Sequence, residues 1–320
     1  MFSPSHVLRL RGAGGSHTSV PGLSSVLLVA AMLFAEPARA QDWRTYFTVQ
    51  NAEKFTTNWR AFYEQTEALT TATRKTVRHH LDLPYGPDPK QRLDLYLPVR
   101  AEDRAPVFLF IHGGGFREGD RADYGFVARP LAAHGIITAV ASYRLLPHVY
   151  PDQVEDVELM LGWLHREVGR YGGDRARIFV GGHSAGAILS ALVGVTADWQ
   201  AKRGVPVDVV KGIVPVSGPY DLRNATGFVA DFLPDPSRRE TASPQLRILR
   251  TPSAVVAFGG KETPYLDASR VFVDRLSATG GHATLIELAG MTHDRTALAM
   301  GDADSAVVKA TIALVTNRRR

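Results

Sequence analysis

The stretch that most constrains the fold of this 320-residue chain is a glycine-flanked serine between two apolar segments. Residues 177–192 read RIFVGGHSAGAILSAL, which predicts a buried strand, a tight turn through GHSAG and a helix of small residues. A Gly-x-Ser-x-Gly turn between a strand and a helix lifts its serine above the end of the sheet. Gly182 and Gly186 suit this turn, because a Cβ at either position would crowd the neighbouring strand or helix. Ser184 is therefore the first candidate for a reactive side chain.

The other apolar runs predict one α/β domain, with a mostly parallel, doubly wound sheet and helices on both faces. Strands alternate with helices after residue 84, and the chain has no internal repeat. The apolar fraction of 45% and the charged fraction of 22% fit an ordinary globular chain. The expected strands are 92–98, as an antiparallel edge strand, and then 107–111, 136–141, 177–181, 212–217, 254–258 and 284–288. The expected helices are 151–171, 187–192, 266–278 and 303–315.

The first 40 residues resemble a targeting segment. Arg9 and Arg11 precede an apolar stretch at residues 26–35, which is followed by Ala38-Arg39-Ala40. This order is typical of a signal peptide cleaved after residue 40 and predicts an exported protein, periplasmic or secreted. The apolar run is too short to span a bilayer.

Residues 41–83 are expected to form an N-terminal helical arm ahead of the main domain at 84–320. Pro84 and the Gly-Pro pair that follows it would end this arm. Its apolar face would be formed in part by Trp59, Phe62, Tyr63 and Leu69.

Composition argues against several classes of function. The chain has 37 basic and 32 acidic residues, and removal of residues 1–40 takes away three Arg and one Glu, leaving 34 against 31. These scattered charges do not indicate nucleic-acid binding, and the basic run at 318–320 is expected to be a solvated tail. Because the chain has no cysteine, it has no disulfide, thiol nucleophile or thiolate metal site. The sequence implies no metal and no organic cofactor.

A serine hydroxyl needs a hydrogen-bonded base before it can act as a nucleophile at neutral pH. His293 is the expected base among the 11 histidines, because it follows the last predicted strand and comes after Ser184 in the chain. In a parallel sheet the carboxyl ends of the strands meet at one edge, where active sites form. His183 adjoins the serine and is expected to point elsewhere, and His112 is expected to orient its own glycine loop.

The base needs a carboxylate that holds its tautomer and stabilises its charged form. Glu262 is the first carboxylate after the strand at 254–258 and is the preferred candidate. Asp267 is the rival and falls inside the following helix. Asp294, next to the histidine, is expected to be a solvated neighbour.

An oxyanion needs backbone N–H donors at positions where side chains would block its approach. His112-Gly113-Gly114-Gly115 follows a predicted buried strand directly, and Gly113 and Gly114 are the expected donors, with Gly115 able to replace Gly113. The N–H of Ala185 at the start of the helix after Ser184 is the third candidate.

From about residue 84 onward the chain resembles the α/β-hydrolase superfamily, in the branch of carboxylesterases and arylformamidases (kynurenine formamidase-like) with an HGGG-type loop. The resemblance is carried by the glycine loop HGGGF (112–116), SYRL (142–145), GHSAG (182–186) and SGPYDL (217–222). It implies an α/β-hydrolase catalytic domain at 84–320 and a Ser184, Glu262 and His293 triad. Two departures are the glutamate in place of the commoner aspartate and HGGGF where formamidases usually have HGGxW.

These observations predict a serine esterase that acts on small carboxylic esters through an acyl-enzyme. The alternatives are an arylformamidase that hydrolyses N-formylkynurenine-type amides and a catalytically silent hydrolase fold used for binding. Residues 223–250 have weak periodicity and are expected to form a small cap that walls the substrate pocket together with the arm.

Overall fold

The computed structural model describes residues 58–98 and 104–317, which all belong to one unit of the chain, Pro37–Arg320. The expected signal peptide at 1–40 lies outside the described residues, as does the first part of the expected arm, 41–57. The described part begins at Asn58, immediately before a helix.

Within these residues the strands form an eight-stranded sheet in the order β1-β2-β4-β3-β5-β6-β7-β8. The β1–β2 and β2–β4 pairs are antiparallel, and all the other pairs are parallel. The mostly parallel sheet that the sequence predicts is therefore confirmed. The strands are β1 (Arg78–Pro84), β2 (Arg92–Leu97), β3 (Ala105–Ile111), β4 (Ile137–Ala141), β5 (Gly173–His183), β6 (Val210–Val216), β7 (Ser253–Gly259) and β8 (Ala283–Leu288).

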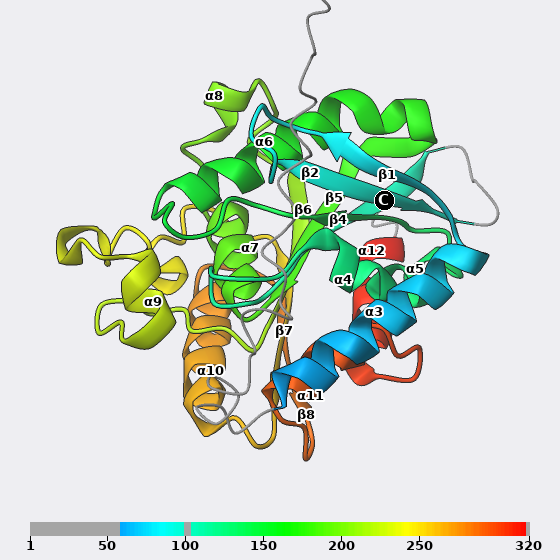
Figure 1. Ribbon diagram of the computed structural model, residues 1–320. Coiled ribbons are helices and arrows are strands. Elements are labelled where there is room, and N and C mark those ends of the chain that lie inside the picture. Colours follow the sequence, from blue (N-terminus) through cyan, green and yellow to red (C-terminus); the bar gives the residue numbers. More distant parts are fainter. Residues whose placement is uncertain (1–57, 99–103, 318–320) are drawn as a thin grey trace, which may run out of the picture. The chain divides into compact units, whose positions relative to one another are not determined.

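Helices cover both faces of this sheet. They are α3 (Trp59–Thr76), α4 (Arg121–Tyr124), α5 (Ala128–Ala132), α6 (Asp152–Glu167), α7 (Ala185–Val195), α8 (Gln200–Arg203), α9 (Gly227–Phe232), α10 (Thr263–Ala278), α11 (His293–Ala299) and α12 (Ala306–Thr316). Side chains of α6, α7 and α10 contribute to the core on one face, and those of α3, α5, α11 and α12 to the core on the other (Figure 1). Parallel strands require such crossover helices, which explains why strands and helices alternate in the sequence.

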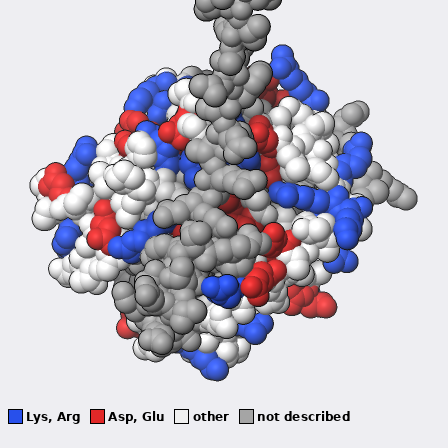
Figure 2. Space-filling view, viewed as in Figure 1, with Lys and Arg blue, Asp and Glu red and all other residues white. Residues whose placement is uncertain are grey.

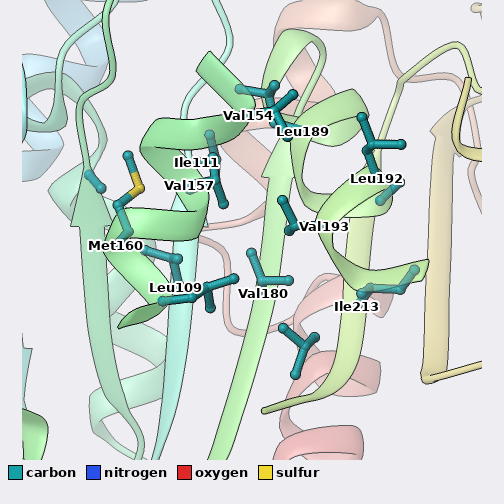
Figure 3. Packing of buried hydrophobic residues seen from close by; sticks show 14 of the residues in the cluster. Leu109, Ile111, Val154, Val157, Met160, Val180, Leu189, Leu192, Val193 and Ile213 are labelled. Carbon is teal, nitrogen blue, oxygen red and sulfur yellow. The ribbon is translucent and has the colours of Figure 1, made fainter. Parts of the chain in front are cut away.

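The core between the central strands and α6 and α7 explains why these strands could be recognised. Figure 3 shows Leu109 and Ile111 of β3 and Val180 of β5 among side chains from the two helices, including Met160 of α6 and Val193 of α7. All seven residues of β3 are buried. A strand that is buried on both faces is a continuous apolar run, and this pattern is visible in the sequence.

Two expectations for the N-terminal part are wrong. The sequence predicts a helical arm as far as residue 83, whereas α3 ends at Thr76 and the chain then forms β1. The sequence also predicts an edge strand at 92–98, whereas β1 covers that strand and is itself the edge. Most side chains of β1 are exposed, so burial imposes no apolar alternation on them. Its backbone pairing with β2 makes it a strand, and such pairing leaves no local pattern.

Helix α3 is anchored to the rest of the described chain by apolar and charged contacts. Phe62 and Tyr63 are buried, as expected, whereas Leu69 is 37% exposed and does not belong to the buried face. Near the C-terminal end of the helix, Arg74 forms an ion pair with the buried Asp94 at 3.0 Å. These contacts fix the helix along its length, and its first residue, Trp59, lies against His293 of α11 (Figure 1).

The segment 223–250 contains α9 and two short 3-10 turns, Pro236–Arg238 and Pro244–Leu246. Its Phe232 is buried and stacks on Phe116, which follows the glycine loop, with 3.9 Å between ring centroids. The segment therefore packs directly against the loop that follows β3.

Several whole-chain expectations can be compared only with the described residues. In these ranges no helix is long and apolar enough to cross a membrane. Nor do they contain three or more His, Cys, Asp or Glu side chains grouped to hold a metal ion. Figure 2 shows basic and acidic side chains interspersed over one face of the molecule, in agreement with the scattered charges of the sequence.

Candidate active site

Ser184 lies between β5 and α7 in a strained turn. Its φ of 56° and ψ of −115° are unusual for a residue other than glycine, and its N–H donates to the Val216 carbonyl at 2.9 Å. A Cβ on Gly182 would lie 2.4 Å from the Gly186 carbonyl oxygen, and one on Gly186 would lie 2.1 Å from the Ile111 carbonyl oxygen. The two glycines therefore permit close packing, as expected, while the positive φ falls on the serine itself.

His293 and Glu262 meet Ser184 at the carboxyl ends of their strands. His293, the first residue of α11, has its Nε2 2.9 Å from the Ser184 Oγ, and its Nδ1 contacts Oε1 of Glu262. Because a carboxylate only accepts, Nδ1 carries the proton, and Nε2 is free to accept from the serine. Asp267 is exposed on α10, and Asp294 accepts a 2.7 Å hydrogen bond from the Thr292 hydroxyl.

The second oxygen of Glu262 is held by two donors. Oε2 accepts from the Gly259 N–H at 2.5 Å and from the Ser217 hydroxyl at 2.6 Å. Ser217 follows β6 directly and, like Ser184, has a positive φ, 55°. The Glu262 side chain is 4% exposed, so these bonds and the histidine satisfy a buried carboxylate.

Behind the histidine lies a buried polar cluster. His183 does not bond to Ser184; its Nε2 donates to the His293 carbonyl at 3.0 Å and lies 3.2 Å from the Thr296 hydroxyl. Its ring packs against that of His293, with centroids 4.6 Å apart. Burial, together with the neighbouring His293, lowers the pKa of His183 well below its usual value. His183 is therefore a neutral support for His293 and does not point away from the site as the sequence predicts.

The glycine loop after β3 is held by its histidine, as the sequence predicts. His112 stacks on Tyr143 at 4.4 Å, and its Nδ1 donates to the Gly113 carbonyl at 2.6 Å. Burial lowers the pKa of His112 to about 4, so the ring is neutral. Gly114 has a φ of 108° and Gly115 one of 59°, conformations that favour glycine.

Near Ser184, the backbone N–H groups of Gly113, Gly114, Gly115 and Ala185 have no acceptor among the residues that the structure describes. Gly113 lies against the serine, since a Cβ on it would be 3.2 Å from the Ser184 Cβ. Ala185 is the first residue of α7, and N–H groups in the first turn of a helix lack intrahelical partners. Gly113 and Ala185 therefore adjoin the serine, and Gly114 and Gly115 line the pocket into which it opens.

Ser184 and His293 open into a pocket of about 330 Å³. Trp59 of α3 contacts the His293 ring edge-on at 6.3 Å, and Tyr265 of α10 stacks on it at 5.3 Å. Segments far apart in the chain thus form one cavity. Its lining residues are Trp59, Gly114, Gly115, Arg117, Glu118, Tyr124, His183, Ser184, Phe228, Tyr265 and His293.

A larger cavity of about 840 Å³ shares no lining residue with this pocket. It lies at the opposite, amino ends of the strands, where Asp174, Ser253 and Thr284 contribute to its wall. Active sites of open α/β sheets form at the carboxyl ends, so the smaller pocket is the candidate site.

Sequence reasoning did not assign a role in the site to Ser217, Glu118 or Tyr265, whereas Phe228 and Trp59 belong to the 223–250 segment and the arm, which were expected to wall the pocket. Ser217 could have been suspected, because it follows a predicted strand as Ser184 does. Glu118 lies in a loop and Tyr265 in a helix, and only the packing of distant segments brings them into the pocket with the serine.

The chain is similar in sequence and fold to several known proteins. The BD-FAE family model matches residues 93–249. Esterase LipC of Mycobacterium tuberculosis is 33% identical over 258 residues, 72% of this chain and 63% of the relative. The kynurenine formamidase of Danio rerio is 30% identical over 167 residues, 51% of this chain and 54% of the relative.

The hyperthermophilic esterase of the archaeon Pyrobaculum calidifontis superimposes with a TM-score of 0.67 over 85% of this chain and 94% of the esterase. At 22% identity this likeness establishes the fold alone. The match with the two sequence relatives spans between one half and two thirds of their length. By fold and by sequence, the chain belongs to the α/β-hydrolase superfamily, in its carboxylesterase and arylformamidase branch.

Proposed function

We propose that the protein is a serine hydrolase that cleaves carboxylic esters of small substrates through an acyl-enzyme. The observation that carries this proposal is the contact series from Ser184 Oγ to His293 Nε2, at 2.9 Å, and from His293 Nδ1 to Glu262. Nucleophile, base and orienting carboxylate within hydrogen-bond reach are what acyl transfer requires. The similarity to esterase LipC supports the ester as substrate class.

In the first step Ser184 Oγ attacks the ester carbonyl carbon while its proton passes to His293 Nε2. Glu262 holds the imidazole in the tautomer with Nδ1 protonated and stabilises the imidazolium that forms. His293 then gives the proton to the leaving alcohol oxygen as the carbon–oxygen bond breaks, which leaves the acyl group on Ser184. Water, deprotonated by His293, attacks this acyl-enzyme and releases the acid.

The negative charge that builds on the carbonyl oxygen is stabilised by the N–H groups of Gly113, Gly114 and Ala185. Their lack of acceptors among the described residues supports this role, because a preformed donor needs no reorganisation during the reaction. The arm helix and the segment 223–250 wall the pocket through Trp59 and Phe228.

An arylformamidase is the second candidate, because the kynurenine formamidase of Danio rerio is 30% identical over about half of the chain. The same serine and oxyanion donors would then act on a formamide carbonyl, and His293 would protonate an aryl amine. The aromatic walls of the pocket, Trp59, Phe228 and Tyr265, are compatible with an aryl group.

Hydrolysis of p-nitrophenyl acetate and N-formylkynurenine by the wild-type protein distinguishes the two candidates. Higher kcat/KM on the ester supports the esterase, and higher kcat/KM on the formamide makes the protein a formamidase. Ser184→Ala should abolish turnover of both, and Glu262→Gln should lower kcat by about 10³–10⁴-fold through loss of the histidine's orientation.

Asp267→Asn is the matched control, because Asp267 is an exposed carboxylate on the helix that Glu262 precedes, and it should keep wild-type rates. Unchanged rates in Ser184→Ala would rule out the mechanism. Equal losses of kcat in Glu262→Gln and Asp267→Asn would instead mean that Glu262 is not the carboxylate that orients His293.

A further inference from the structure

Glu118 brings an unexplained carboxyl into the pocket that contains Ser184. It lies in the turn after the glycine loop, where its N–H donates to the Gly114 carbonyl at 3.1 Å. Its Cγ is 3.0 Å from the position that a Cβ on Gly114 would take. The carboxyl is therefore held close to one of the proposed oxyanion donors, and it has no part in the proton transfers between Ser184 and His293.

The carboxyl of Glu118 is buried but incompletely satisfied. The residue is 8% exposed, and its Oε2 is buried without a hydrogen-bond partner among the described residues. The Tyr63 side chain of α3 lies near the carboxyl and lowers its pKa, but by less than burial raises it. A buried polar atom without a partner is destabilising, so such an atom in a substrate pocket calls for an explanation.

The surroundings favour an uncharged partner. Burial, reinforced by the nearby Asp123 carboxylate, raises the pKa of Glu118 to about 8, so the carboxyl is neutral at pH 7. Arg117 lines the same pocket, where its charge is paired with that of Asp231. The other contributions to the wall are mainly aromatic, including Trp59 and Phe228. A neutral carboxyl can both donate and accept a hydrogen bond, which suits a hydroxyl group.

We propose that Glu118 is a specificity-determining residue that hydrogen-bonds an uncharged hydroxyl on the substrate, so that the enzyme prefers hydroxyl-bearing esters to their apolar isosteres. This inference rests on the proposed function of the Ser184 site. The inference adds one recognition contact to that function. An otherwise apolar group of the substrate enters between the aromatic walls and places its hydroxyl against Oε2 of Glu118. Pockets that combine apolar walls with a few polar groups fix the orientation of their ligands in this way.

Isosteric substrate pairs test the contact, because a hydroxyl and a methyl group have similar size. The acyl pair is p-nitrophenyl 3-hydroxybutanoate and p-nitrophenyl 3-methylbutanoate. The alcohol pair is 2-hydroxypropyl acetate and 2-methylpropyl acetate. Wild-type protein should prefer the hydroxyl member of at least one pair by about 10-fold or more in kcat/KM, since a site built around a hydroxyl leaves its own polar atom unpaired with the analogue.

Glu118→Met should reduce that preference to about onefold, whereas Glu118→Gln, which can still donate and accept, should retain most of it. Glu64→Met is the matched control: it removes an exposed carboxylate of α3 and should keep the preference. A purely structural role of Glu118 would lower both members of a pair equally and leave their ratio unchanged.

Absence of a hydroxyl preference in wild-type protein with both pairs overturns the inference, and this comparison does not depend on how any variant folds. Persistence of the preference in folded Glu118→Met overturns it as well. If the proposed function itself is wrong, the result is different: none of the four esters is then hydrolysed in a Ser184-dependent manner.

Discussion

At the scale of single residues, two serines with positive φ mark the candidate site. Ser184 follows β5 with a φ of 56°, and Ser217 follows β6 with a φ of 55°. Side chains other than glycine adopt this region at a cost of about 1–3 kcal/mol, so such residues are kept where their position matters. In both cases the strained turn brings a hydroxyl to a partner: His293 for Ser184 and Glu262 for Ser217.

Two substitutions of Ser217 distinguish the effect of losing its hydroxyl from the effect of relieving its backbone strain. Ser217→Ala and Ser217→Gly both remove the donor to Glu262, and both should lower kcat by about 10-fold or more, because hydrogen bonds to charged groups are worth about 1.5–3 kcal/mol. Only glycine adopts the positive φ without strain. The free energy of unfolding of the glycine variant should therefore exceed that of the alanine variant by about 1 kcal/mol. Steady-state kinetics and urea unfolding measure the two effects. A glycine variant with wild-type kcat would contradict the role of Ser217.

At the scale of elements, the arm helix α3 links folding to the pocket. Its first residue, Trp59, contacts the His293 ring, while Phe62 and Tyr63 pack into the core, and Arg74 near its C-terminal end pairs with Asp94. The helix lies more than 200 residues from His293 in the chain, so its contribution to the site is entirely tertiary.

Truncation of the buried face of α3 should destabilise the protein. Phe62 is 3% exposed, and Phe62→Ala should lower the free energy of unfolding by about 3–5 kcal/mol through lost burial and a new cavity. Leu69→Ala on the same helix is the control, because Leu69 is 37% exposed and its truncation should change stability by less than about 0.5 kcal/mol. Urea unfolding of both variants measures the difference, and similar losses would mean that α3 does not dock through Phe62.

At the scale of the whole molecule, buried carboxyls connect stability to pH. Burial, with the Asp120 and Glu67 charges, raises the pKa of Asp123 to about 7. In the unfolded chain the pKa of an aspartate is about 3.9, so between these values the folded protein binds more protons than the unfolded one. Stability then falls as pH rises across this window, and Glu118 extends the trend toward pH 8.

Asp123→Asn should flatten this dependence in part, because an amide does not titrate. Between pH 5 and about pH 7, ionisation of Asp123 should lower the free energy of unfolding of the wild-type protein. The free energy of unfolding of the variant should fall less over the same interval. Urea unfolding at pH 5, 6, 7 and 8 measures both curves. Parallel curves would show that Asp123 is ionised in the folded protein throughout.

The sequence by itself determined the elements whose pattern is local. The central strands are continuous apolar runs because they are buried on both faces, and the glycines around Ser184 and in the 112–115 loop reflect close backbone packing. Chain order and strand ends then led to Glu262 and His293, which the structure brings to Ser184.

Tertiary structure alone decided the rest. The exposed strand β1 is defined by its pairing with β2, which leaves no periodicity in its side chains. Ser217, Glu118 and Tyr265 reach the site through packing between segments that are distant in the chain. A local pattern records which side of an element is buried, whereas the partners of a side chain depend on how the elements pack. For this reason the sequence predicted the serine, histidine and carboxylate that meet in the pocket, while only the fold revealed most of the side chains around them.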